Sequence, residues 1–573
     1  MTAPIQYLGM DAKDIKYRYN WNAPIIWSKH ESNTYYHGAQ LLLKTTDMGV
    51  TWKEVSPDLT RNEKSKQGKG GGPYTNEAVG AENYGTLSYV IESPHEKGVI
   101  WTGSDDGLVH VTRDGGATWQ NVTPAGLQEC LINAIEVSPH DKSVAYIATT
   151  RYKFNDHAPG LYKTIDYGKT WNKIIAGIPN NAFTRVVRED DKRKDLLFAG
   201  TELGMFVSWN GGKEWSPFQL NLPVTPITDL RIHQNNLIAS TSGRSFWVLD
   251  DLDLFRQYKS DAPGLALFQP TPTVIVNGSS ELDRTSDDFD GTHPYRGINP
   301  ATGVVMYYQL PELKGSELIT LEIKDSQGNV VRTFSSQRDT TSVSYAGAPP
   351  TDPTLSKSKG LNRFVWNLRY PTMIGVPNIY IESSYRGHKA SPGKYTATLR
   401  VGTQQAITDF SVVSNPLYPT DAKTYQDYHS LMQRMETDLN AMHQMVNSLY
   451  NKKEQLETLL NSLPKDKNAG LRSEGAALVQ RIKQWDEEMV QRKSKAYDDV
   501  ENFPNKFTAN YLFMINHAES DIPMVTQPTL DRLKELNAIW ATLQTRGQQL
   551  LEKDLPAFNK QLWDAGVGAI WKK

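Results

Sequence analysis

Apolar residues follow two different periods along this chain, and the change between them divides the sequence. Up to about residue 413 they gather in short runs that end in small or turn-forming residues, as at 99–103 and 196–200, which is typical of β-strands. Beyond it they recur at alternating spacings of three and four, which predicts amphipathic helices, and Pro464 favours the end of the first one. The seam of that helix consists of Tyr425, Tyr428, Met432, Met435, Leu439, Met442, Val446 and Leu449.

One eight-residue phrase, Thr-x-Asp-x-Gly-x-Thr-Trp, recurs within the β part at 45–52, 112–119 and 164–171, with a degenerate copy at 208–215. The Asp can accept N–H groups across a tight turn, the Gly supplies a positive φ, and the Trp buries a large ring as the next strand opens. The irregular spacing of the copies suits a four-stranded unit with loops of different length. Repetition of such units predicts a β-propeller with about five blade units, the last of which, at 237–249, has lost the phrase.

Composition narrows the class of protein. The chain has 573 residues with 62 basic and 64 acidic side chains, a net charge of −2, which excludes the basic field of a general nucleic-acid binder. No apolar run approaches the length of a membrane span, and the first residues lack the pattern of a signal peptide. The single cysteine, Cys130, excludes an intrachain disulfide framework and is expected to be a small buried apolar residue.

The patterns divide the chain into four segments of a multidomain, mainly β protein. We expect a propeller, complete or incomplete, at 1–257, followed by a linker at 258–300, where Pro, Gly, Ser and Asp are frequent. About seven short strands then predict an immunoglobulin-like β-sandwich at 301–415. The segment 416–573 is expected to form a helical bundle or hairpin.

The recurring phrase resembles the Asp-box, or BNR, repeat of sialidase-like and sortilin-like propellers. The surrounding sequence is similar to bacterial extracytoplasmic proteins labelled as glycosyl hydrolases with BNR repeats or as sortilin-N-terminal-like, and the likeness covers almost the whole chain. It rests on the phrases at 18–24, 55–60, 103–107, 200–204 and 243–250. Within the predicted sandwich, the phrases at 363–369 and 392–396 are similar to a FlgD-like domain.

This resemblance implies a location outside the cytoplasm, in the periplasm, on the cell surface or secreted. We expect no cofactor. Related chains carry more propeller before residue 18, and a secretion signal before that. Five units are enough to close a small propeller, but we expect this chain to be the C-terminal portion of a longer exported protein. Its partners would then include the N-terminal propeller half or another subunit.

The resemblance also sorts the candidate site residues. In sialidase-like folds the boxes lie on peripheral hairpins, so the residues expected to be structural are Asp47, Asp114, Asp166 and Asn210. The predicted catalytic residues follow strands that end in glycine, and we expect them at equivalent places in two successive blades. They are Asp105, Asp106 and Glu202. A glycoside hydrolase needs two carboxyl groups roughly 5–10 Å apart, whereas the alternative role of such residues beside Gly is turn geometry. The predicted ligand-binding residues are Glu82, Arg244 and Asp250.

Other classes of site fit less well. Three histidines recur at one repeat position and are expected to be turn residues, so no metal site is predicted; they are His30, His95 and His140. A sialidase needs an arginine triad, but nothing in the spacing selects three of Arg113, Arg151, Arg185 and Arg244. A sortilin-type receptor needs a disulfide-rich module, which one cysteine cannot form.

Two functions remain, one of binding and one of catalysis. The first is a binding or scaffold protein that holds a glycan or protein ligand on its central propeller face, the C-terminal domains serving assembly. The alternative is a glycoside hydrolase that acts on a polysaccharide through paired carboxylates. In both predictions the protein binds no nucleic acid and does not span a membrane.

Overall fold

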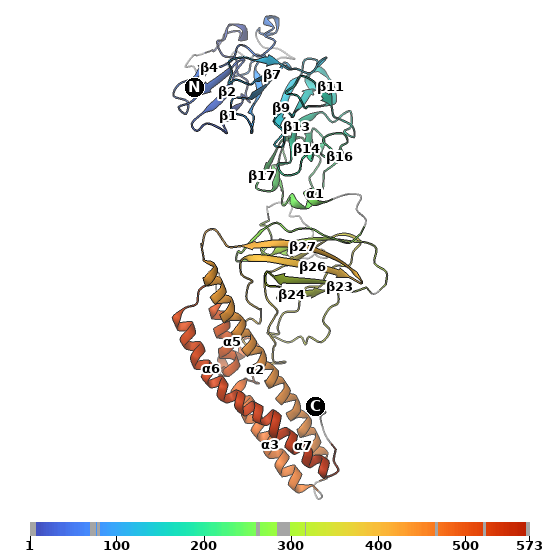
Figure 1. Ribbon diagram of the computed structural model, residues 1–573, viewed down its shortest axis with the longest axis vertical. Helices are drawn as coiled ribbons and strands as arrows, with labels where there is room; N and C mark the ends of the chain where they lie inside the picture. The colour runs from blue at the N-terminus through green and yellow to red at the C-terminus, as the bar shows by residue number, and fades with distance from the viewer. Residues whose placement is uncertain are drawn as a thin grey trace. The chain divides into compact units, whose positions relative to one another are not determined.

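The computed structural model of this protein describes residues 7–68, 76, 81–258, 264–283, 298–315, 317–464, 468–519 and 523–568. The chain forms two compact units, Met1–Arg256 and Gln257–Lys573. The described residues are mainly β, arranged in small antiparallel sheets, with helices at the C-terminal end (Figure 1). The predicted order of strands followed by helices is therefore confirmed.

The first unit is a succession of five sheets, each built from strands consecutive in sequence, and the short helix α1 (Asp253–Gln257) follows the last of them. We number these sheets 1 to 5. Sheets 1 and 2 contain β1 (Ile25–Trp27), β2 (Tyr35–Gly38), β3 (Leu42–Thr45) and β4 (Lys53–Glu54), then β5 (Leu87–Glu92), β6 (Ile100–Ser104), β7 (Val109–Thr112) and β8 (Gln120–Asn121). Sheets 3 and 4 contain β9 (Leu131–Val137), β10 (Ala145–Arg151), β11 (Asp156–Thr164) and β12 (Asn172–Lys173), then β13 (Thr184–Glu189), β14 (Leu197–Thr201), β15 (Gly204–Ser208) and β16 (Ser216–Pro217). Sheet 5 has three strands, β17 (Ile227–His233), β18 (Asn236–Thr241) and β19 (Phe246–Leu249).

The first strands of neighbouring sheets lie side by side, β5 with β9, β9 with β13, and β13 with β17. Small residues on the second strands make room for this packing. A Cβ on Gly103 would come within 2.4 Å of Ile132, and one on Gly200 within 2.7 Å of Ile227, closer than real Cβ contacts. The small residues that end these apolar runs are therefore explained by packing between sheets.

Each turn formed by the recurring eight-residue phrase is held by its own side chains. In the first copy, the carboxylate of Asp47 accepts the Thr51 hydroxyl at 2.6 Å, the Thr51 N–H at 2.8 Å and the Thr45 hydroxyl at 2.7 Å. The hydrogen bonds from Thr51, followed by the one from Thr45, lower the pKa of Asp47 to about 2. The degenerate copy keeps two of the three bonds, because Asn210 accepts the Ser208 hydroxyl and the Glu214 N–H.

The tryptophans that end the recurring phrase in sheets 2 to 4 each join their sheet to the one before it. In sheets 2 to 4 the indole N–H donates to the backbone carbonyl directly after the fourth strand of the preceding sheet. In sheet 1, Trp52 instead donates to Gly49 in its own turn, at 3.1 Å. The three bonds between sheets are Trp119 to Val55 at 2.9 Å, Trp171 to Val122 at 2.7 Å and Trp215 to Ile174 at 2.8 Å.

The three repeated histidines form a second series of contacts between sheets. Each ring lies on the turn between the first two strands of its sheet, and its Nε2 is within hydrogen-bond distance of a carbonyl on the equivalent turn of the next sheet. The pairs are His30 with Ser93 at 2.8 Å, His95 with Ser138 at 2.9 Å and His140 with Asp190 at 2.7 Å. The prediction that these histidines are turn residues is confirmed, and each also links two sheets.

The second unit begins at Gln257, directly before the predicted linker 258–300, and strands lie within that stretch. There β20 (Ala266–Leu267) pairs with β22 (Val304–Leu310), and β21 (Thr273–Val274) pairs in parallel with β27 (Gln404–Val413). Two sheets, β20-β22-β25 and β21-β27-β26-β23-β24, share one core with Tyr308, Trp366 and Phe410. Their remaining strands are β23 (Ile319–Asp325), β24 (Val330–Ser335), β25 (Gly360–Trp366) and β26 (Gly393–Val401). The sandwich thus includes strands before position 301.

The helices of the second unit share a single apolar core, to which the short α4 (Asp499–Asn502) contributes no buried residue. They are α2 (Ala422–Ser462), α3 (Ala469–Met489), α4, α5 (Phe507–Ala518), α6 (Gln527–Gln548) and α7 (Leu555–Asp564), with a π-helical turn at Gln549–Asp554. The predicted seam of α2 is buried from Tyr428 to Leu449, and the helix ends two residues before Pro464. Tyr425, the first member of the seam, is only half-buried. In the part of the chain that the structure describes, no helix has both the length and the apolar character needed to cross a membrane.

Candidate ligand-binding site

A cleft of about 420 Å³ lies on the first strands of sheets 2 to 5, and we call it the inner-strand cleft. Each of the four strands contributes one polar residue: Ser88 from β5, Asn133 from β9, Arg185 from β13 and Thr228 from β17. Because these strands are neighbours, side chains far apart in sequence meet at one place.

The four residues share a backbone feature. Each stands where the pairing of the first strand with the second is interrupted: Ser88 between Leu87 and Tyr89, and Asn133, Arg185 and Thr228 at the matching interruptions in sheets 3 to 5. Such a β-bulge inserts an unpaired residue and re-aims its side chain, and bulges are frequent beside functional sites. One irregularity, repeated in four sheets, therefore directs four polar side chains into the cleft.

The loop after β10 supplies aromatic and cationic groups. A single 3₁₀ turn, Tyr152–Phe154, places Arg151, Tyr152, Lys153 and Phe154 in the wall, and it closes on Asn155 with a φ of 58°. The ring of Tyr152 stacks on Phe183 with centroids 5.4 Å apart. The guanidinium of Arg151 lies 5.6 Å from the ring of Phe154 and bonds to the Gln128 side chain. The turn thus presents two rings and two cations together.

Asp105 is the predicted catalytic residue that lines the cleft. Its Oδ1 accepts the N–H groups of Gly85 and Thr86 at 3.0 and 2.8 Å, and its Oδ2 accepts the Thr86 hydroxyl at 3.0 Å. Burial, and then the neighbouring carboxylate of Asp106, raise the pKa of Asp105 to about 7, although these three hydrogen bonds act in the opposite direction. This carboxyl group can therefore take up a proton near neutral pH.

Asp106 and Glu202 have other partners. Asp106 is buried and accepts the Ser104 hydroxyl at 2.5 Å and the Arg61 N–H at 2.8 Å, away from the residues that line the cleft. Glu202 accepts from Nε and Nη2 of Arg185 at 2.9 and 2.7 Å, so it stands behind a cleft residue. Asp105 follows β6 of sheet 2 and Glu202 follows β14 of sheet 4, with sheet 3 between them. The prediction that these residues belong to successive blades is therefore wrong.

The three predicted ligand-binding residues do not line this cleft. Glu82 accepts the indole N–H of Trp21 at 2.7 Å on the surface. Arg244 is exposed, its guanidinium donates to the carbonyl of Gly243, and its own backbone carbonyl accepts the indole N–H of Trp247. Asp250 is exposed directly after β19.

Sequence reasoning noted Arg151 and Arg185 without selecting them, and it missed Asn133, Tyr152 and Lys153. A signal was present, because a polar residue stands at the second or third place of the first strand in sheets 2 to 5, at Ser88, Asn133, Arg185 and Thr228. In an uninterrupted strand, successive side chains point to opposite faces of the sheet, so the position of a residue predicts the face on which its side chain lies. A bulge inserts an unpaired residue and interrupts this alternation, so the position alone no longer predicts the face.

The arrangement favours recognition of an anion. Among the residues that line the cleft, Arg151, Lys153 and Arg185 are cations and Asp105 is the single carboxylic acid. Arg185 uses Nε and Nη2 for Glu202, and a guanidinium has five N–H donors, so others are left for a ligand. Within the described ranges, no group of three or more His, Cys, Asp or Glu side chains is placed to hold a metal ion.

No protein-family model matches the chain, and no curated protein matches it. Among solved structures, a GH74 xyloglucanase from Xanthomonas campestris is 14% identical, with a TM-score of 0.31 over 67% of this chain and 63% of that one. An ancestral GH74 enzyme is 12% identical, with a TM-score of 0.29 over 60% of this chain and 41% of that one, so the chain spans about two fifths of its length. YCF48 from Cyanidioschyzon merolae is 13% identical, with a TM-score of 0.23 over 43% of this chain and 85% of that one. All three TM-scores are below 0.5, so the functional argument rests on the chain's own residues.

Proposed function

We propose that the first unit is an Asp-box propeller, or a portion of one, that binds an anionic ligand in the inner-strand cleft. The ligand is a glycan or a protein segment that carries carboxylates. The observation that carries this proposal is the β-bulge repeated in four neighbouring sheets, which directs Ser88, Asn133, Arg185 and Thr228 into one cleft.

The chemistry of the wall supports this ligand class. Guanidinium groups bind carboxylates through paired, charge-assisted hydrogen bonds, and Arg185 is already oriented by Glu202. The rings of Tyr152 and Phe154 provide flat apolar surface beside these donors, and the amide of Asn133 and the hydroxyls of Ser88 and Thr228 suit ligand hydroxyl or peptide groups. A cleft of about 420 Å³ is within the usual range for ligand pockets.

The hydrolase alternative has support in one observation. Asp105 has a pKa of about 7, which suits a general acid at neutral pH. A glycosidase also needs a second carboxyl group across the scissile bond, and Asp105 is the only acidic residue among those that line the cleft. Binding is therefore the function that these residues favour.

We also propose an extracytoplasmic location, supported by the Asp-box phrases, and a packing partner for the ends of the sheet succession. Ile25 and Trp27 on β1 are 61% and 64% exposed, and Phe246 and Val248 on β19 are 76% and 54% exposed. Apolar groups at both terminal sheets suit coverage by further propeller blades or by a second subunit. The native mass, compared between the intact protein and a Trp27→Ser/Phe246→Ser variant, tests this: a mass that is monomeric in both contradicts it.

The ligand is tested by calorimetric titration of the whole chain with polygalacturonate fragments, neutral cello-oligosaccharides and a glutamate-rich peptide. We expect an acidic probe to bind, and Arg185→Ala to weaken it by about tenfold or more, equivalent to about 1.4 kcal/mol. Arg113→Ala is the matched control, since this arginine is exposed and lies over the ring of Tyr167 outside the cleft.

Three results would contradict the proposal. They are equal binding of neutral and acidic probes, an unchanged affinity in Arg185→Ala, and an equal loss in the Arg113→Ala control. Turnover of a polysaccharide that disappears in Asp105→Asn would replace binding by hydrolysis.

A further inference from the structure

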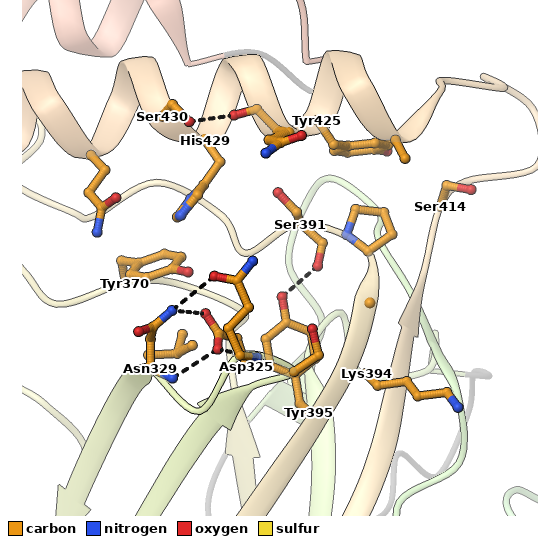
Figure 2. Close-up of a pocket in the computed structure, with 18 of the residues that line it drawn as sticks. Asp325, Asn329, Tyr370, Ser391, Lys394, Tyr395, Ser414, Tyr425, His429 and Ser430 are labelled. Carbon is orange, nitrogen blue, oxygen red and sulfur yellow. Dashed lines mark hydrogen bonds between the residues drawn. The ribbon is translucent and has the colours of Figure 1, made fainter.

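The second unit contains a larger cleft, of about 720 Å³, between helix α2 and one edge of the sandwich (Figure 2). We call it the helix–sandwich cleft. One wall is the first three turns of α2. The other consists of the β23–β24 hairpin around Asp325 and Asn329, and the turn that leads into β26 at Ser391. None of these residues belongs to the proposed propeller site.

The helical wall is a polar face beside the buried seam of α2. Tyr425, His429 and Gln433 are spaced by four residues, so they lie on one side of the helix. They line the cleft together with Gln426 and Ser430, whereas Tyr428 and Met432 of the seam are buried in the helical core. Figure 2 shows His429 extending from α2 toward Tyr370 of the sandwich side.

The cleft is lined by hydroxyl, amide and phenol groups with little net charge. The formally charged residues among those that line it are Asp325 and Lys394. Asp325 is engaged in its own hairpin, where it accepts the N–H groups of Gln327 and Asn329, each at 2.9 Å, and the Asn329 side-chain amide at 3.0 Å. Lys394 is exposed. A neutral ligand with several hydroxyl groups therefore fits this lining better than an ion.

A buried chain of three residues fixes the protons of His429. Glu436 is 8% exposed and accepts from His388, through the backbone N–H at 2.7 Å and through ring Nδ1 at 3.0 Å. The Nε2 of His388, a residue with 0% exposure, lies 2.8 Å from Nδ1 of His429. The ring of Tyr370 stacks on His388 at 4.5 Å and nearly parallel, which holds the imidazole in place.

The direction of these hydrogen bonds follows from what each group can donate. A carboxylate only accepts, so Nδ1 of His388 carries a proton and its Nε2, when the ring is neutral, is an acceptor. Nδ1 of His429 must then donate to it, which leaves Nε2 of His429 as an acceptor. Burial is the largest cause that lowers the pKa of His429, and the charges of Glu436 and Asp325 act in the opposite direction. The lowered pKa favours the neutral form of the His429 ring.

Two further side chains of the cleft can contact a ligand, one through a hydrogen bond and one through an aromatic ring. The hydroxyl of Ser391 is shielded from solvent and has no hydrogen-bond partner among the described residues, which is costly unless it is satisfied. Across the cleft from it, Tyr425 is half-buried on α2 (Figure 2). Aromatic faces of this kind bind the apolar face of a sugar ring, and the hydroxyl and amide groups bind its edges.

We propose that the helix–sandwich cleft is a second ligand site of this protein and binds a neutral carbohydrate, with Nε2 of His429 accepting a ligand hydroxyl and Tyr425 packing on a sugar ring. Glu436 and His388 are positioning residues, since they set the tautomer of His429 without lining the cleft. The site does not depend on the proposed function of the first unit.

The test is saturation-transfer-difference NMR on the whole chain with three neutral probes, cellotriose, maltotriose and chitotriose. We expect at least one to bind, and His429→Ala and Tyr425→Ala each to weaken it by about tenfold. The matched controls are His517→Ala and Tyr497→Ala, which change exposed residues elsewhere in the second unit and should leave the affinity unchanged. Thermal melting checks that all four variants fold.

The proposal is overturned if none of the three probes binds, or if the cleft variants bind as well as the controls do. It is also overturned if binding survives in those variants but is lost in Arg185→Ala, because the sugar would then occupy the inner-strand cleft. Failure of the acidic probes at that cleft leaves this result unaffected, so the two proposals are tested separately.

The positioning role has its own measurement. Long-range ¹H–¹⁵N spectra at neutral pH should show His429 with its proton on Nδ1, and Glu436→Gln should change that tautomer population, while His517 keeps its spectrum. A proton on Nε2 of His429 in the unaltered protein would overturn the assigned direction of the hydrogen bonds.

Discussion

The contacts between sheets lead to a prediction about one indole group. Trp215 is 2% exposed, and its N–H donates to the carbonyl of Ile174 in the preceding sheet at 2.8 Å. Trp215→Phe keeps an aromatic ring but removes the donor. Trp52→Phe makes the same change in the first sheet, where the N–H of the half-buried Trp52 bonds to Gly49 of its own turn. The two substitutions therefore compare a bond between sheets with a bond inside a hairpin.

The magnitude follows from what is left behind. In Trp215→Phe the carbonyl of Ile174 loses a buried partner, which costs about 1–3 kcal/mol, and the smaller ring leaves part of its site unfilled. We expect a total of about 2 kcal/mol or slightly more. In Trp52→Phe water can replace the donor, so the loss should stay near 0.5 kcal/mol. For a unit of this size, about 2 kcal/mol corresponds to a fall in Tm of roughly 4–8 °C.

The assay is differential scanning calorimetry of the whole chain. The two compact units are expected to give separate transitions, and the transition of the second unit, which neither substitution touches, serves as the internal reference. Equal shifts in the two variants would refute the reasoning, because they would mean that the bond between sheets adds nothing beyond the turn. A shift of the reference transition in Trp215→Phe would also refute it.

Two further predictions concern Asp105 and Gly200. The pKa of Asp105 in the folded chain, about 7, lies above its ordinary value of 3.8. Protonation of Asp105 therefore stabilises the folded state, by at most about 4 kcal/mol, and this contribution is complete below about pH 4. It is lost as the pH rises through 7. Asp105→Asn can keep the two bonds from backbone N–H groups, and its amide N–H can donate to the Thr86 hydroxyl in place of the third. Urea unfolding between pH 4 and 8 should therefore show a flatter stability profile; an unchanged slope refutes the raised pKa. Gly200→Ala places a Cβ 2.7 Å from Ile227 and should cost about 1–3 kcal/mol in the same assay. Gly470→Ala, in open space on α3, should cost nothing.

The sequence predicted part of the candidate site. Asp105 follows a strand that ends in glycine, which predicts a place at a functional face, and it lines the inner-strand cleft. The same rule predicts Glu202, yet Glu202 bonds to Arg185 and does not line the cleft. Position after a strand locates a residue near a face, but a neighbouring side chain decides whether it is free for a ligand.

The sequence by itself determined the repeating hairpins, their Asp, Gly and Trp positions, and the buried seam of α2, because local hydrogen bonds and apolar periodicity act within a few residues. Tertiary structure decided which polar groups come together. The bulges that aim Asn133 and Arg185 into one cleft, and the chain from Glu436 to His429 in the other, join residues whose contact depends on packing between elements. A strand's period or a helix's spacing carries no information about such partners, because the interaction is formed only when distant surfaces meet.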